Sequence, residues 1–94
     1  MKTSTVIAQT TKGHRIFLEG TAAIGWPMGA RYHVTYEADT ILLQLAPEGR
    51  RKVTASKGGV IDLESKKVTQ WARGAKQCIV VHGNGRIAIE RVVA

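Results

Sequence analysis

The sequence predicts a mostly β protein with two short helices, in which one unit of strand, short helix and hairpin occurs twice. The first observation is a repeat. Residues 16–45 recur in changed form at residues 61–91, and the chain's two tryptophans, Trp26 and Trp71, lie 45 positions apart at matching places. The second is the alternation of apolar and polar residues in short runs, which is typical of half-buried strands. The third is the glycine-containing turn signals that separate these runs. We therefore predict two repeats of about 45 residues related by a pseudo-two-fold axis.

Corresponding positions of the two repeats carry similar residues. With the shift of 45 positions, apolar strand residues and a corner glycine coincide: Ile16 with Ile61, Leu18 with Leu63, Gly29 with Gly74, Val34 with Ile79 and Tyr36 with Val81. A one-residue slip, which we place in the hairpin turn, then matches Ile41 and Leu43 with Ile87 and Ile89. One such unit is a sheet with an unburied face, and a second copy about a two-fold axis buries that face.

The elements of the first repeat follow from its residue pattern. Residues 1–13 favour a leading strand, or an arm that pairs with another strand, and residues 16–18 a second strand. Residues 20–24 suit one or two helical turns, which end where Gly25 offers a C-cap of positive φ and Pro27 prevents continuation. Alternation then predicts a strand at 31–36, a turn at 37–40 and a return strand at 41–45.

The second repeat has the same order of elements. A basic run at 50–54 is followed by a loop at 56–59 and a strand at 60–63. A helix is expected at 64–71, with Ser65 as its N-cap, and Gly74 closes the corner after it. The last elements are strands at 77–82 and 86–92, and the Asn-Gly dipeptide between them is a strong signal for a tight hairpin turn.

The chain length of 94 residues predicts one domain, 1–94, whose halves share one core. Repeat one covers residues 5–46, repeat two covers residues 50–93, and the linker at 46–49 contains Pro47 and Gly49. This linker is short enough to favour pairing of the halves within one chain. We therefore expect a monomeric pseudo-dimer; the alternative is a homodimer through the apolar arm at 6–8.

The charge is high and unevenly distributed. The net charge is +7, of which residues 1–47 carry +1 and residues 48–94 carry +6. A small basic domain usually meets a polyanion, most often nucleic acid, although the charge also serves solubility. The sequence has no apolar run of about 18 residues and no signal peptide, so we expect no membrane association and a cytoplasmic location.

The order of elements, with these residues, resembles the AbrB/MazE/SymE superfamily of swapped-hairpin proteins. The first repeat is most similar to the SymE-type variant, through Ile16, Leu18 and Gly20, then Gly25-Trp26 and Gly29; residues 51–71 are similar to AbrB itself. In that family, two chains interlock their hairpins in one β-barrel, and the basic loop and helix ends bind DNA. The resemblance implies that this single chain supplies both halves of a pseudo-two-fold swapped-hairpin β-barrel.

The two repeats differ where the family is basic. Lys66 and Lys67 match the family's basic pair at the start of the helix, whereas the first repeat has Thr21-Ala22 there. Arg51-Lys52 match the basic leading strand, whereas we place Ile7 and Ala8 at these positions of the first repeat. The resemblance therefore implies that the second half contacts DNA and the first is mainly scaffold, in contrast to the symmetric reading of a palindrome by a homodimer.

Eight basic residues are the candidates for nucleic-acid binding. Such side chains neutralise phosphates and release counterions, and guanidinium groups also bind guanine edges. The alternatives are a solvated linker and an exposed helix face, and Arg73 and Lys76 are expected to be solubilising. The candidates are Arg50, Arg51, Lys52, Lys57, Lys66, Lys67, Lys12 and Arg15.

Other residue types indicate packing rather than chemistry. The matching positions of Trp26 and Trp71 favour a core role over base stacking. Cys78 is alone, which excludes an intramolecular disulfide, and we expect it to be a small buried residue. The three histidines lack partners at metal-ligand spacing, and no catalytic motif is present. We therefore expect no enzyme activity, no cofactor and no metal.

The sequence favours a small DNA-binding protein of AbrB-like type, either a transcriptional regulator or an antitoxin-like factor. DNA is the expected partner, ahead of RNA. Two alternatives stay open: a phage- or plasmid-type interaction module that inhibits a host or defence protein, and a SymE-like toxin that acts on RNA.

Overall fold

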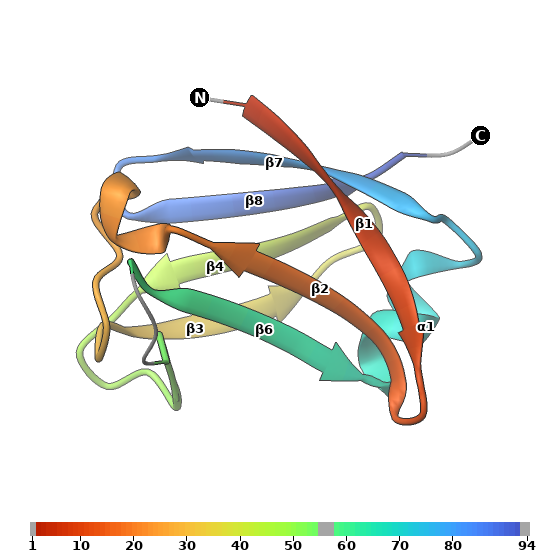
Figure 1. The fold of residues 1–94 in the computed structure, drawn as a ribbon, viewed down its shortest axis with the longest axis horizontal. Coiled ribbons are helices and arrows are strands. Elements are labelled where there is room, and N and C mark those ends of the chain that lie inside the picture. Colours follow the sequence, from red (N-terminus) through yellow and green to blue (C-terminus); the bar gives the residue numbers. More distant parts are fainter. Residues whose placement is uncertain (1, 55–57, 93–94) are drawn as a thin grey trace.

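A computed structural model describes residues 2–54 and 58–92 (Figure 1). Within these residues the fold comprises eight strands, one short 3-10 helix and one α-helix. In chain order they are β1 (Lys2–Thr10), β2 (Gly13–Glu19), η1 (Thr21–Ile24), β3 (Arg31–Tyr36), β4 (Thr40–Leu45), β5 (Arg51–Lys52), β6 (Val60–Ser65), α1 (Lys66–Ala72), β7 (Gln77–Gly83) and β8 (Arg86–Arg91). None of the described helices is long and apolar enough to cross a membrane.

The strands form one antiparallel sheet that curls into a nearly closed β-barrel. Their order is β5-β3-β4-β8-β7-β1-β2-β6. The two ends of this order meet where the backbone N–H of Thr54, just after β5, donates to the carbonyl oxygen of Val60 in β6 at 3.0 Å. The predicted class, a mostly β protein with two short helices, is therefore confirmed.

The strand pairing follows a pseudo-two-fold axis. The β3–β4 hairpin of the first repeat lies between β5 and β8, which both belong to the second repeat. At the β2–β6 pair, Phe17 lies opposite Asp62, its own counterpart 45 positions later. At the β4–β8 pair, Leu42 lies opposite Ala88, its counterpart 46 positions later. Because the hairpins of the two repeats interleave, each half needs the other to complete its sheet.

The one-residue slip between the repeats precedes the hairpins. Tyr36 lies opposite Ile41, and His82 lies opposite Ile87, so β3 and β7 correspond with a shift of 46, like the strands that follow them. This shift matches Val34 with Val80, whose side chain is 5% exposed and faces the core. The predicted matches of Val34 with Ile79 and of Tyr36 with Val81, and the placement of the slip in the turn, were therefore wrong.

The leading strands are also offset from the predicted match. Val53 is the counterpart of Ile7. Both are buried, with Val53 2% and Ile7 4% exposed. The backbone N–H of Val53 donates to Ala30, just before β3, and that of Ile7 donates to Lys76, just before β7, both at 2.9 Å. Arg51 and Lys52 thus correspond to Thr5 and Val6, not to Ile7 and Ala8. Thr5 and Val6 are uncharged like Ile7 and Ala8. The predicted charge difference between the two repeats at the leading strand therefore remains.

The two short helices begin and end at the expected kinds of residue. η1 is followed by Gly25 with a φ of 88°, the left-handed conformation that glycine adopts without strain. α1 begins at Lys66 rather than at Glu64, because Glu64 and Ser65 still belong to β6. The side chain of Ser65 accepts a hydrogen bond from the backbone N–H of Val68 at 3.4 Å, which confirms Ser65 as the N-cap.

One hydrophobic core fills the barrel. The rings of Trp26 and Tyr32 pack at a centroid distance of 5.5 Å, and both side chains are buried. Trp71 is also buried, which confirms the predicted core role of both tryptophans. Cys78 is fully buried, and this burial raises the pKa of its thiol to about 11. Apolar residues of both repeats join this core, among them Ile16, Ile41, Leu43, Ile61, Leu63, Ile87 and Ile89.

Candidate nucleic-acid interface

Four of the predicted basic residues surround one open cavity. It has a volume of about 740 Å³ and lies between β3 and the junction of β6 with α1. Arg50 lies just before β5 and Arg51 lies within it, whereas Lys66 and Lys67 come from the first turn of α1. We call this cavity the basic cleft; its lining residues are Tyr32, His33, Val34, Tyr36, Arg50, Arg51, Ser65, Lys66 and Lys67.

The barrel opens at the basic cleft because β5 is only two residues long. In the first repeat, the nine-residue β1 pairs with β7 through its first half and with β2 through its second half. The second repeat has no room for such a strand, because the linker must first cross from the end of β4. Gly49 of this linker packs against Tyr32 so closely that a Cβ atom at Gly49 would lie 2.5 Å from the backbone oxygen of Tyr32. The side chain of Arg31 also donates to the carbonyl oxygen of Gly49, at 3.1 Å.

The positive charges at the basic cleft face solvent. The side chains of Arg50, Arg51, Lys66 and Lys67 are exposed, and within residues 2–54 and 58–92 none of them forms an ion pair. Because these four side chains are exposed and form no ion pair there, they are available to phosphate groups. Their proximity to one another raises the local positive potential.

Two titratable groups at the basic cleft respond to their surroundings. Burial raises the pKa of Tyr32, and the neighbouring guanidinium of Arg51 partly opposes this effect. The linker carboxylate Glu48 lies 3.4 Å from Nε2 of His33, and its pKa is lowered by a hydrogen bond from its own backbone and by His33. Glu48 therefore stays ionised and pairs with His33 when that ring is protonated.

The pseudo-two-fold axis relates the basic cleft to a smaller cavity whose described lining has no lysine or arginine. That cavity has a volume of about 260 Å³, and its lining includes Ser4 and Thr5 of β1, Glu19, Gly20 and Thr21. In the corrected alignment, Ser4 and Thr5 occupy the positions of Arg50 and Arg51, and Thr21 and Ala22 those of Lys66 and Lys67. We call it the smaller cleft. The same fold thus presents four cations on one side and uncharged residues at the equivalent positions on the other.

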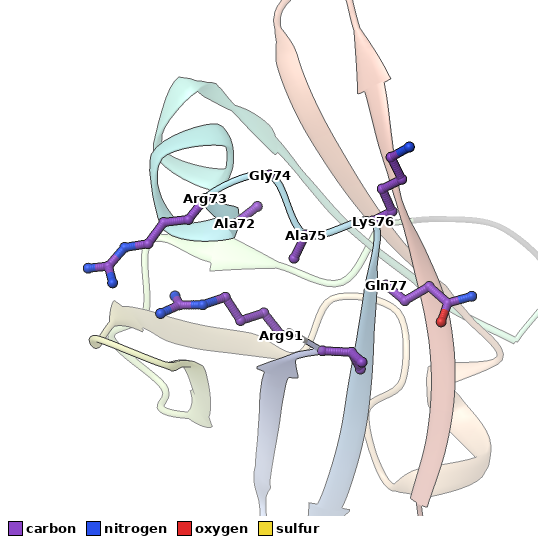
Figure 2. A pocket seen from close by; sticks show the side chains of 8 residues that line it. Ala72, Arg73, Gly74, Ala75, Lys76, Gln77 and Arg91 are labelled. Carbon is purple, nitrogen blue, oxygen red and sulfur yellow. The ribbon is translucent and has the colours of Figure 1, made fainter. Parts of the chain in front are cut away.

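The positive surface continues along α1. A second cavity of about 570 Å³ shares Lys67 with the basic cleft and reaches Arg73 at the end of the helix. A third cavity, of about 770 Å³, begins at Arg73 and extends to Lys76 (Figure 2). Arg73 was predicted only to aid solubility, but it lies on the same side of the barrel as the basic cleft. Its position at the end of the helix that begins with Lys66 and Lys67 is the signal that could have identified it.

Arg91 holds this region together. Its guanidinium donates to the carbonyl oxygen of Trp71 at 2.7 Å and to the Asp39 carboxylate at 2.6 Å, and it also donates to the carbonyl oxygen of Ala38. The side chain is 6% exposed and lies 5.7 Å from the centre of the Trp71 ring. Arg91 therefore joins α1 to the β3–β4 turn, and its charge is engaged within the protein.

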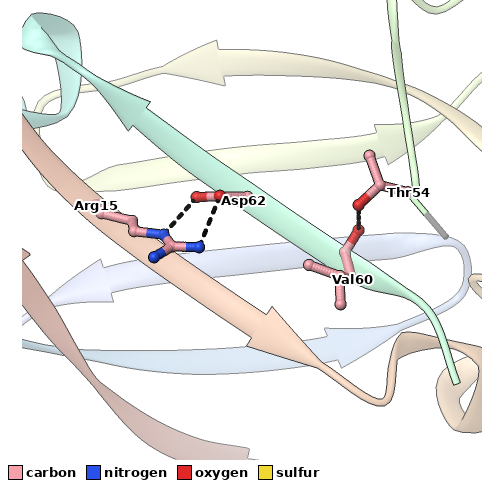
Figure 3. A network of polar contacts seen from close by, with 4 residues as sticks. All are labelled: Arg15, Thr54, Val60 and Asp62. Atoms are coloured by element: carbon pink, nitrogen blue, oxygen red, sulfur yellow. Dashed lines mark hydrogen bonds and ion pairs between the residues drawn. The ribbon is translucent and has the colours of Figure 1, made fainter. Parts of the chain in front are cut away.

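Arg15 lies away from the basic cleft and is already paired. Its guanidinium donates two hydrogen bonds to the Asp62 carboxylate, at 3.0 and 2.9 Å (Figure 3). It also stacks over the ring of Phe17. The hydrogen bond to Asp62 raises the pKa of Arg15. A phosphate would have to compete with Asp62 for this side chain, which makes Arg15 a poorer candidate than the cleft residues.

The remaining three candidates have different positions. Lys12 is exposed in the β1–β2 turn, and just after this turn His14 of β2 contacts α1, with 2.8 Å between His14 Nδ1 and Thr69 Oγ1. Lys52 is exposed and lies opposite Arg31; because neighbouring strand residues point to opposite faces, it points away from Arg51 and the basic cleft. Lys57 lies outside the described residues.

Comparisons of the chain with protein-family models, with curated proteins and with solved structures found no match.

Proposed function

We propose that this protein binds duplex DNA through the basic cleft and the exposed side of α1, as a small regulator or antitoxin-like factor of AbrB-like type. The supporting observation is the gathering of Arg50, Arg51, Lys66 and Lys67 around one cavity, although they come from two elements separated in sequence. The residues at the four equivalent positions of the first repeat are uncharged, so the shared fold does not account for these cations. A function confined to one half accounts for them.

The proposed contacts are mainly electrostatic. Lys66 and Lys67 stand at the start of α1 and neutralise phosphates, which fix the position of the protein on the duplex without reading sequence. Arg50 and Arg51 offer planar guanidinium groups that bind phosphates or the O6 and N7 edge of guanine. Because residues 2–54 and 58–92 form one basic cleft, we expect one protein to contact one non-palindromic stretch of DNA.

The proposal predicts strongly salt-dependent binding of the unmodified protein. If the four cleft cations each neutralise one phosphate, the slope of log K against log salt concentration is about −3.6, and affinity falls about 100-fold between 50 and 200 mM salt. Fluorescence anisotropy with a labelled duplex of about 20 base pairs measures this slope. A slope near zero, or the absence of binding at 50 mM salt, would contradict the proposed function.

A further inference from the structure

One edge of β3 is left without a partner strand at the basic cleft. β5 pairs with β3 only at Arg31 and Tyr32, and within residues 2–54 and 58–92 no strand continues this pairing toward Tyr36. The open stretch therefore comprises His33 to the end of the strand. It borders the cavity of about 740 Å³, so there is space beside it.

The hydrogen-bonding groups on this edge can be assigned from the neighbouring pairs. The backbone N–H of Glu37 donates to the carbonyl oxygen of Thr40 at 2.8 Å. Because alternate residues of a strand face the same neighbour, Thr35 and His33 also direct their backbone groups toward β4. Val34 and Tyr36 therefore direct their N–H and C=O groups to the open side. Two donors and two acceptors face the basic cleft in a row, as at the edge of any incomplete sheet.

The counterpart of this edge shows which kind of element it accepts. β7, the strand of the second repeat that corresponds to β3, is covered by the first half of β1, which runs antiparallel to it and places Thr3 opposite Val80. Val80 is the counterpart of Val34. At β3 the residues that would play this part are Glu48 and Gly49, but they form the linker turn.

We propose that the open edge of β3 binds an extended acidic peptide segment of another protein, which adds as an antiparallel strand. Strand addition supplies the backbone hydrogen bonds that Val34 and Tyr36 lack. The charge of the site selects the partner, because Arg50, Lys66 and Lys67 surround the edge and favour carboxylate side chains. This inference does not depend on DNA binding, although a bound peptide would cover some of the same cations.

The first test uses a fluorescent peptide of alternating glutamate and valine, seven residues long, with acetylated and amidated ends. We expect saturable binding, and we expect the amide protons of Val34 and Tyr36 to exchange with solvent at least about 10-fold more slowly when the peptide is bound. Absence of binding up to 1 mM peptide, or unchanged exchange of both amides in the saturated complex, would overturn the proposal.

Two modified peptides separate strand pairing from charge attraction. One carries N-methyl groups on every valine and the other on every glutamate, so both keep the charge of the parent. In an antiparallel pair only alternate residues donate to β3. We therefore expect that at least one modified peptide fails to bind, whereas equal affinity of all three peptides would show simple charge attraction and contradict strand addition. No nucleic acid is present in these measurements, so their outcome is separate from that of the DNA titration.

Discussion

Replacing Lys66 and Lys67 by glutamate is expected to lower the affinity for duplex DNA by about 100-fold at 0.1 M salt. The loss of two phosphate contacts reduces the magnitude of the salt slope by about 2, and the introduced negative charges repel the phosphates. Both side chains are exposed, and acidic residues in the first turn interact favourably with the helix dipole, so α1 should remain folded. Anisotropy titrations at several salt concentrations measure both the affinity and the slope.

The matched control is the variant Arg86→Glu with Gln44→Glu and Asn84→Asp. It changes the net charge by the same amount, but these residues lie at the β7–β8 turn and on the neighbouring strand β4, far from α1 in the barrel (Figure 1), and none of them lines the basic cleft. Its affinity is expected to stay within about 5-fold of the unmodified protein, through general charge alone. Equal losses in the two variants would show that net charge, rather than the basic cleft, determines binding.

Replacing Trp26 by alanine is expected to unfold both halves of the barrel together. Trp26 is 1% exposed, and removing a buried side chain of this size costs about 3–5 kcal/mol, a large part of the stability of a small domain. The melting temperature should fall by at least about 12 °C. The variant Trp26→Phe, which leaves a smaller cavity, should retain most of the stability.

The remaining tryptophan makes this prediction specific to the interleaved fold. In the Trp26→Ala variant, Trp71 is the only tryptophan, and it reports on the second repeat. Because the hairpins of the two repeats interleave, the fluorescence of Trp71 should change in the same transition as the circular dichroism signal. A second half that kept its native fluorescence after the first half had melted would show two independent units and contradict the single core.

Much of the fold could be predicted from local signals and from the repeat. The alternation at 31–36 predicted β3 with its observed bounds, and the Asn84-Gly85 pair forms the β7–β8 turn with a positive φ at both residues. Ser65 caps α1 as expected, because a serine oxygen before a helix satisfies a free N–H group. The equal positions of the two tryptophans predicted their shared burial.

The details that shape the candidate site could not be predicted, because they depend on contacts between distant residues. The pairing of Arg15 with Asp62 joins residues 47 positions apart, so the charge of Arg15 seemed free in the sequence. The shortness of β5 follows from the path of the linker across Tyr32, which no local pattern reveals. The counterpart of Arg51 in the first repeat is Thr5 rather than the predicted Ile7. This match depends on which residues face the core, and only the strand register determines that.

The two repeats share a frame, but we propose that only the second supplies the cations that bind DNA. Two-dimensional amide NMR spectra recorded during addition of duplex DNA test this proposal, because counterparts in the two repeats are observed in one experiment. We expect signals of residues 50–52 and 66–73 to shift, while those of their counterparts at 4–6 and 21–28 stay in place. Equal shifts in both repeats, or shifts confined to the first, would contradict it.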